Sequence, residues 1–169
     1  MALKKEYLKL PYRPNISLVV FKRTSSGNQF LLVQLKDWQN NWWKFPQGGI
    51  DAGESFQVAG KREFEEELGN RNLKIIGLSQ YTNEYDWPGV VIKKNGEKYR
   101  GQFQHFLLVE FLGKDAEIKL DSQEVRKFRW VRLEELLEMS QKEKPLFNNY
   151  HGVIAKIIKE FSVSLIKAR

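Results

Sequence analysis

The sequence contains no cysteine, which excludes disulfide bridges, cysteine-ligated zinc or iron–sulfur sites and a thiol nucleophile. It has only two histidines, His105 and His151, which disfavours a metal cage built from several histidines. No apolar run reaches the roughly 18 residues of a membrane-spanning helix. The first residues, Met-Ala-Leu-Lys-Lys-Glu, lack the apolar core of a secretion signal. We therefore expect a cytoplasmic protein that makes no contact with a membrane.

The composition is that of a globular protein with a basic balance. The chain has 169 residues, of which 41% are hydrophobic and 13% aromatic, enough to bury a core without disulfide or metal support. We expect residues 1–169 to form one domain with an extended N-terminal arm over 1–15. Lys and Arg number 28 against 21 Asp and Glu, a net charge of +7. This excess favours anionic partners such as phosphates, nucleotides or nucleic acid.

Hydrophobic patterning predicts several strands and few helices. β-branched and aromatic runs bounded by turn residues indicate strands over 16–23, 29–35, 73–81, 101–111, 117–120 and 127–131. Capping residues and apolar spacing indicate helices over 55–68, 133–139 and 150–165. The stretch 83–99 is expected to be a polar, aromatic loop or hairpin, and 142–149 a polar loop. The pattern predicts an α/β (α+β) fold in which helices cover a central sheet.

Three glutamates of the predicted helix 55–68 carry the strongest chemical signal. Glu63, Glu66 and Glu67 are three and four positions apart, so they share one helix face. Carboxylates on one face repel each other unless a cation lies among them, and Mg²⁺ prefers such oxygen ligands. Glu65 points away toward solvent, and Arg62 either neutralises the cluster or ties the helix to the preceding loop through Glu54. Taken without its context, however, such a run is more often an ordinary solvated acidic face.

Its context is a glycine-rich loop followed by a fixed spacing of charged residues. The stretch 48–70 resembles the Nudix box, Gly-x5-Glu-x7-Arg-Glu-U-x-Glu-Glu-x-Gly-U, in which U is a bulky apolar residue. The matching positions are Gly48, Glu54, Arg62, Glu63, Phe64, Glu66, Glu67 and Gly69. One position departs from the pattern, because Asn70 stands where the last apolar residue is expected.

The resemblance implies a pyrophosphohydrolase with an α/β/α sandwich around a mixed central sheet. It also implies Mg²⁺ or Mn²⁺ bound by Glu63, Glu66 and Glu67, with the carbonyl of Gly48 as a further ligand. Clustered divalent cations would activate a water molecule and neutralise the oxygens of the pyrophosphate group. We therefore expect the three glutamates to be catalytic as well as metal-binding.

Segments outside the box resemble one branch of this family. Residues 12–15 (Tyr-Arg-Pro-Asn), 43–49 (Trp-Lys-Phe-Pro-Gln-Gly-Gly) and 101–106 (Gly-Gln-Phe-Gln-His-Phe) are similar to the bacterial RNA pyrophosphohydrolases and the related asymmetric diadenosine-polyphosphate hydrolases. Glu124 matches a further glutamate of that group, which implies a metal ligand or a general base. A residue of a solvated surface loop is an equally good interpretation of Glu124.

Substrate contacts follow from the same resemblance. It implies that Arg13 binds phosphate and that Gln104 lines the nucleotide site, while Lys36 and Lys44 are basic candidates for the phosphate chain. Tyr85, together with the neighbouring Trp87, has the aromatic face needed to stack on a base. The structural alternatives are a solvated arm residue for Arg13 and hydrophobic cover of a loop for the two aromatic residues.

Four functions remain open at this point. Pyrophosphate removal from 5′-triphosphorylated RNA is the preferred interpretation, and hydrolysis of dinucleoside polyphosphates is the next. A hydrolase of free nucleoside triphosphates and a non-catalytic nucleotide or RNA sensor are the others, although the complete set of box glutamates argues against a sensor. No obligate protein partner is evident from the sequence.

Overall fold

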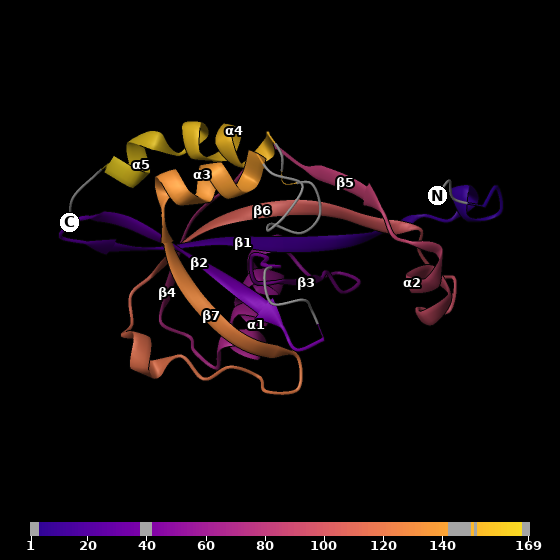
Figure 1. Cartoon of the computed structure of the whole chain (residues 1–169), viewed down its shortest axis with the longest axis horizontal. Helices are drawn as coiled ribbons and strands as arrows, with labels where there is room; N and C mark the ends of the chain where they lie inside the picture. Colours follow the sequence, from indigo (N-terminus) through magenta and orange to yellow (C-terminus); the bar gives the residue numbers. More distant parts are fainter. Residues whose placement is uncertain (1–3, 38–41, 142–149, 151, 167–169) are drawn as a thin grey trace.

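The computed structural model describes residues 4–37, 42–141, 150 and 152–166. Its elements are η1 (Tyr7–Lys9), β1 (Tyr12–Thr24), β2 (Gly27–Leu35), β3 (Gln47–Gly49), α1 (Phe56–Leu68), β4 (Leu73–Leu78), β5 (Asn83–Asp86), α2 (Gly89–Lys94), β6 (Gly101–Phe111), η2 (Asp115–Glu117), β7 (Val125–Arg132), α3 (Leu133–Gln141), α4 (Val153–Glu160) and α5 (Ser162–Ile166). Helices lie on both sides of a central sheet, with α1 on one side and α3, α4 and α5 on the other (Figure 1). This arrangement confirms the predicted α+β layers.

The sheet is mixed, as predicted. Its main path runs β4-β6-β1-β2-β7, with β3 paired to β1 and β5 paired to β6. The pairing of β1 with β6 is parallel, whereas the other strand pairs are antiparallel. Because β1 lies between β6 and β2, its run from 15 to 21 is buried on both faces. Successive side chains of a strand point to opposite faces, so this one strand contributes to both cores.

Two apolar cores separate the layers. Ile16, Leu18 and Val20 pack with α1, whereas Val19 and Phe21 pack with α3 and α4 on the opposite face. Both groups are removed from water, so the strand contributes burial on each side, worth about 1.5–3 kcal/mol for each large apolar side chain. Strand β1, which is packed on both faces, therefore gives helix α1 and its side chains a fixed support.

Helix α1 has the boundaries expected from its sequence. The side chain of Ser55 caps its N-terminus by accepting a bond from the Val58 backbone N–H. Gly69 ends the helix in the left-handed conformation, with a φ of 59° and its N–H bonded to the carbonyl of Glu65. Phe64 and Leu68 face the core, which fixes the orientation of the intervening glutamates.

Several sequence predictions were wrong. Residues 117–120 form no strand, because the Lys119 N–H bonds the carbonyl of Leu68 at the end of α1 instead of a neighbouring strand. The stretch 83–99 contains β5 and α2 in place of a loop or a simple hairpin, and β1 begins at Tyr12, inside the expected arm. The helix expected over 150–165 is divided at Phe161 into α4 and α5, and the expected strand 73–81 ends at Leu78. The loop 142–149 and His151 lie outside the described residues.

No helix among the described residues is both long and apolar enough to cross a membrane.

Candidate active site

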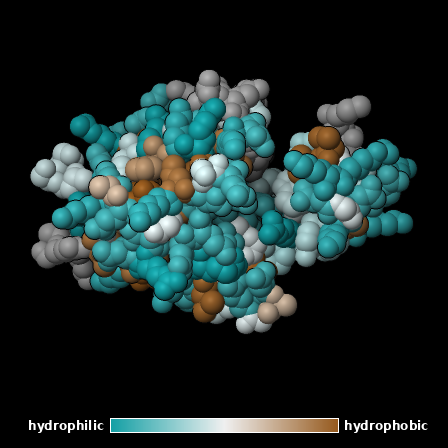
Figure 2. Space-filling model, turned by 90° about the horizontal axis from the view of Figure 1, so that it is seen from below, coloured by the Kyte–Doolittle hydropathy of each residue, from teal (hydrophilic) through white to brown (hydrophobic). Residues whose placement is uncertain are grey.

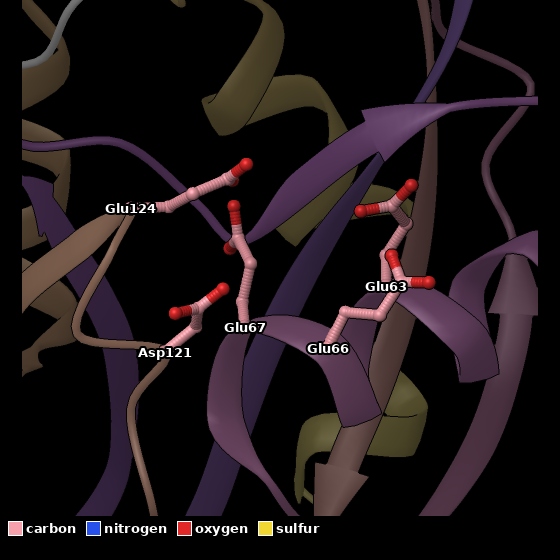
Figure 3. Close-up of a pocket in the computed structure, with 5 residues that line it drawn as sticks. All are labelled: Glu63, Glu66, Glu67, Asp121 and Glu124. Carbon is pink, nitrogen blue, oxygen red and sulfur yellow. The ribbon is translucent and has the colours of Figure 1, made fainter.

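Five carboxylates line one cavity beside α1. The cavity has a volume of about 210 Å³ and is lined by Glu63, Glu66, Glu67, Asp121 and Glu124. The three helix residues lie on one face of α1, while Asp121 and Glu124 approach from the loop before β7 on the other side of Glu67 (Figure 3). All five side chains that line this cavity are carboxylates, which gives it a high density of negative charge.

Backbone hydrogen bonds hold the loop of Asp121 and Glu124 in place. The Asp121 N–H bonds the carbonyl of Glu67 at 3.3 Å, which attaches the loop to the end of α1. The Lys36 N–H bonds the carbonyl of Glu124 at 2.9 Å, which attaches it to the end of β2. Asp121 was not among the predicted site residues, although its place three residues before Glu124 in an Asp-Ser-Gln-Glu segment offered a signal.

Glu67 is buried against a lysine. Its carboxylate is 3% exposed and accepts a bond from Lys44 Nζ at 2.7 Å, with a second, from the Gln47 N–H, at 3.3 Å. Burial raises the pKa of Glu67, and the Lys44 ammonium opposes this rise. Lys44 was expected to contact the phosphate chain. The structure shows it 6% exposed and bonded to Glu67.

Arg62 joins the other side of the cluster to the glycine-rich loop. Its guanidinium bonds Glu54 through two nitrogens at 2.9 and 2.8 Å, and the carbonyl of Gly49 at 2.8 Å. It also reaches Glu63 at 2.6 Å and Glu66 at 3.2 Å. The predicted link from Arg62 to Glu54 is confirmed, and this contact lowers the pKa of Glu54 to about 2. Desolvation raises the pKa of the buried Glu63, against the effect of Arg62.

Two adjacent glycines of β3 separate the carboxylates from Arg13. A Cβ added at Gly48 would overlap the carboxylate of Glu63, and one added at Gly49 would overlap the guanidinium of Arg13. Because neighbouring residues of a strand face opposite sides, Glu63 and Arg13 lie on opposite faces of β3. Neither close approach is possible with a larger residue at these positions.

Gln104 and Tyr85 belong to a buried polar network on the face of the sheet opposite α1. The side chain of Gln104 donates to Gln47 at 2.7 Å and to Ser17 at 3.0 Å, and it is completely buried. The hydroxyl of Tyr150 also donates to Gln47, at 2.9 Å. Tyr85 is 9% exposed, and its hydroxyl bonds Gln102, so its ring is covered where base stacking was expected.

Lys36 is exposed beside the carboxylate loop and Trp87 is half-buried. Glu65, expected to point toward solvent, lies outside the cavity and pairs with Arg71 at 2.5 Å.

The sequence comparisons agree with this geometry. The family model described as the NUDIX domain matches residues 11–150. The chain belongs to the Nudix family. An RNA pyrophosphohydrolase of Gluconobacter oxydans is 37% identical over 126 residues, which cover 72% of each chain. An RNA pyrophosphohydrolase of Sphingopyxis alaskensis is 41% identical over 133 residues, which cover 76% of this chain and 82% of the relative.

Solved Nudix structures share the fold. The Ap4A hydrolase of C. elegans in a binary complex has a TM-score of 0.64 at 20% identity, covering 90% of this chain and 97% of that one. A Nudix hydrolase of M. smegmatis has a TM-score of 0.68 at 13% identity, covering 94% and 91%. At these identities the likeness establishes the fold alone. Family membership makes the chain a phosphoanhydride hydrolase.

The Nudix site fits a hard divalent cation. Nudix hydrolases generally depend on divalent metals, and carboxylate oxygens line the cavity. Burial raises the pKa of both Glu63 and Glu67, so a further positive charge would stabilise their ionised forms. Among the described residues no three of these side chains are arranged as a set of metal ligands, and two of the cavity carboxylates bond Arg62 and Lys44.

Proposed function

We propose that this Nudix hydrolase removes pyrophosphate from the 5′ end of triphosphorylated RNA. The observation that carries the proposal is the acidic cavity beside the Nudix helix, in a chain whose curated relatives named RNA pyrophosphohydrolase are 34–41% identical. A triphosphate end presents the phosphoanhydride that the family hydrolyses, and the basic chain suits a polyanion.

Mg²⁺ or Mn²⁺ is the cofactor of this proposal. We assign its binding to Glu63, Glu66, Glu67 and Glu124, with the carbonyl of Gly48, and we add Asp121 because it lines the same cavity. When bound, the metal supplies a water of lowered pKa and neutralises the charge of the phosphate oxygens.

The protein's own groups then have distinct tasks. Glu124 is exposed at the cavity edge, where its carboxylate can take the proton of the attacking water. We assign phosphate binding to Arg13, which lies against Gly49, and to Lys36, while Lys44 serves as the counter-ion of Glu67. Gln104 and Tyr85 act through the buried network that shapes the nucleotide side of the sheet.

Product analysis with three substrates tests the proposal. Triphosphorylated RNA, diadenosine tetraphosphate and single nucleoside triphosphates are compared at equal concentration with Mg²⁺, and the products are identified. We expect pyrophosphate and monophosphorylated RNA, with the highest kcat/KM for RNA. A higher kcat/KM for diadenosine tetraphosphate or free nucleotides would contradict the assignment, and stoichiometric binding without phosphate release would indicate a sensor.

A matched pair of variants tests the metal helix. Glu67→Gln should remove most of the Mg²⁺-dependent turnover, because it replaces a carboxylate of the cavity. Glu65→Gln removes the same charge from the same helix but lies outside the cavity, so its turnover should stay near that of the wild type. Equal rates for the two variants would contradict the assignment.

A further inference from the structure

The N-terminal arm and the segment between β5 and β6 form a small lobe at one end of the molecule. We define the basic lobe as residues 4–11 and 87–100, which include η1 and α2. Its centre is Tyr7, 2% exposed, whose ring lies beside Gly89 and whose hydroxyl donates to Glu97 at 3.3 Å. The lobe projects from the main body and its visible face is mostly hydrophilic (Figure 2, right).

The base of the lobe is fixed to the sheet. The guanidinium of Arg100 bonds the carboxylate of Asp86 at 2.7 and 2.9 Å and lies over the ring of Tyr12 at 4.7 Å. The Arg100 N–H also bonds the carbonyl of Pro11 at 3.0 Å, which joins the two segments of the lobe. These contacts hold the lobe in a defined position relative to the cavity.

Most of the net charge of the chain resides in this lobe. Its 22 residues hold seven Lys and Arg against two Glu, a net charge of +5 out of +7. Five lysines of the lobe are exposed and have no carboxylate within ion-pair distance among the described residues: Lys5, Lys9, Lys93, Lys94 and Lys98. Like charges gathered on so small a unit repel each other, and the ion pairs of the lobe, Lys4 with Glu6 and Arg100 with Asp86, leave these five lysines without a paired carboxylate among the described residues.

The lobe lies within reach of a polymer whose end occupies the acidic cavity. Gly48 pairs with Ile16, and Tyr12 at the base of the lobe is four residues farther along β1. At about 3.3 Å per residue this separation is about 13 Å. Helix α2 lies beyond the end of β1, on the side of the sheet that α1 covers (Figure 1).

We propose that the basic lobe binds the phosphodiester backbone of the RNA that follows the 5′ end. This inference rests on the proposed function and identifies what the protein recognises beyond the triphosphate. Lysine is depleted in protein–protein interfaces, whereas phosphate contacts are made by just such exposed cations. The two large apolar side chains exposed on the lobe, Leu8 and Val90, do not provide the apolar centre of a protein interface.

A charge-removal variant with a matched control tests the lobe directly. Lys93→Ala/Lys94→Ala/Lys98→Ala removes three positive charges from the lobe. The control, Lys74→Ala/Lys114→Ala/Lys159→Ala, removes three from exposed positions elsewhere, where the described chain also offers no ion-pair partner. Circular dichroism checks the fold of each. Should the lobe variant not fold, Lys5→Ala/Lys9→Ala tests the same surface from the arm.

Binding is measured by fluorescence anisotropy with single-stranded RNA that carries a 5′-hydroxyl, so the reading does not depend on catalysis. Each lost phosphate contact should reduce the slope of log K against log salt concentration by about 0.7, hence by about 2 for three contacts. The affinity of the lobe variant should fall roughly 10–100-fold at low salt, and that of the control should stay near wild type. Equal affinities for the lobe variant and the control would overturn the proposal, as would equal competition by polyglutamate.

Kinetics separate this proposal from the proposed function. The lobe variant should raise KM for long triphosphorylated RNA while kcat, and both constants for a triphosphorylated dinucleotide, stay at the wild-type values. An equal KM change for the dinucleotide would overturn the lobe assignment. If the wild type released no pyrophosphate from either RNA but the lobe variant still lost RNA affinity, the proposed function would fail and the lobe assignment would stand.

Discussion

Replacing Gly48 with alanine should damage the acidic cavity while sparing the fold. The new Cβ would overlap the carboxylate of Glu63, which must move by more than about 1 Å to restore a contact of 3.4 Å. The backbone of Gly48 does not have a positive φ, so alanine fits its conformation. The displaced group is the end of a flexible side chain, and we therefore expect a loss of stability below about 1 kcal/mol.

The expected cost to catalysis is much larger. A displacement of about 1 Å in a catalytic group lowers the rate about 10²-fold, which corresponds to about 2.7 kcal/mol of transition-state stabilisation. The assay is pyrophosphate release at saturating Mg²⁺, with urea unfolding of the same samples. Gly53→Ala is the control: its φ of 81° strains the backbone, but open space surrounds the added Cβ. A Gly48→Ala enzyme with the wild-type kcat/KM would refute the placement of Glu63 against this glycine.

Four further results are expected. Lys44→Met leaves Glu67 buried without its counter-ion, so it should lower the free energy of unfolding at pH 8 by about 3–5 kcal/mol. Mg²⁺ should restore part of this lost stability, and urea titration measures both effects. Burial raises the pKa of Glu63 and Glu67 above the ordinary 4.5, so protons compete with the metal for these carboxylates. The increase in Tm that Mg²⁺ gives should therefore shrink as the pH falls, and this decrease should begin above pH 4.5. An increase that is constant down to pH 4.5 would contradict this. Glu124→Gln should lower kcat about 10²–10⁴-fold, whereas Asp121→Asn should raise the Mg²⁺ requirement about 10–100-fold.

Local signals predicted the parts of the fold that depend on local contacts. Helix α1 was predictable because Ser55, Gly69 and the apolar spacing between them each specify a helix of that length. The segment 117–120 alternates like a strand, but its backbone bonds the end of α1, a contact that sequence proximity does not reveal. Helix α2 has only six residues, and three of them are Val or Ile, which favour strands, so the burial of Tyr7 and Ile92 between two distant segments explains why it forms.

The residues of the candidate site likewise divide into those that local sequence predicts and those whose positions depend on tertiary contacts. The shared face of the box glutamates follows from 3.6 residues per turn and needed no tertiary information. The position of Asp121 depends on one backbone bond to Glu67 across the gap between α1 and the loop before β7. The bond of Lys44 to Glu67 required strand β2 to bring residue 44 next to Val33, on the side of the sheet that faces α1. Charge alone could not distinguish a lysine that binds phosphate from one that neutralises a buried carboxylate.

The cationic side chains named above therefore form two groups, those that bond the carboxylates of the cavity and those of the basic lobe that do not. Arg62 and Lys44 each bond a cavity carboxylate, which burial would otherwise favour in its protonated form. On the proposed metal assignment, a divalent cation would bind the same oxygen atoms, so its binding would displace or share these contacts. Lys5, Lys9, Lys93, Lys94 and Lys98 of the basic lobe have no described carboxylate within ion-pair distance, and Tyr12 at the base of the lobe lies about 13 Å along β1 from Ile16, the partner of Gly48. On the proposed function, this separation would let a chain with a net charge of +7 keep an acidic cavity and bind the polyanionic substrate beside it.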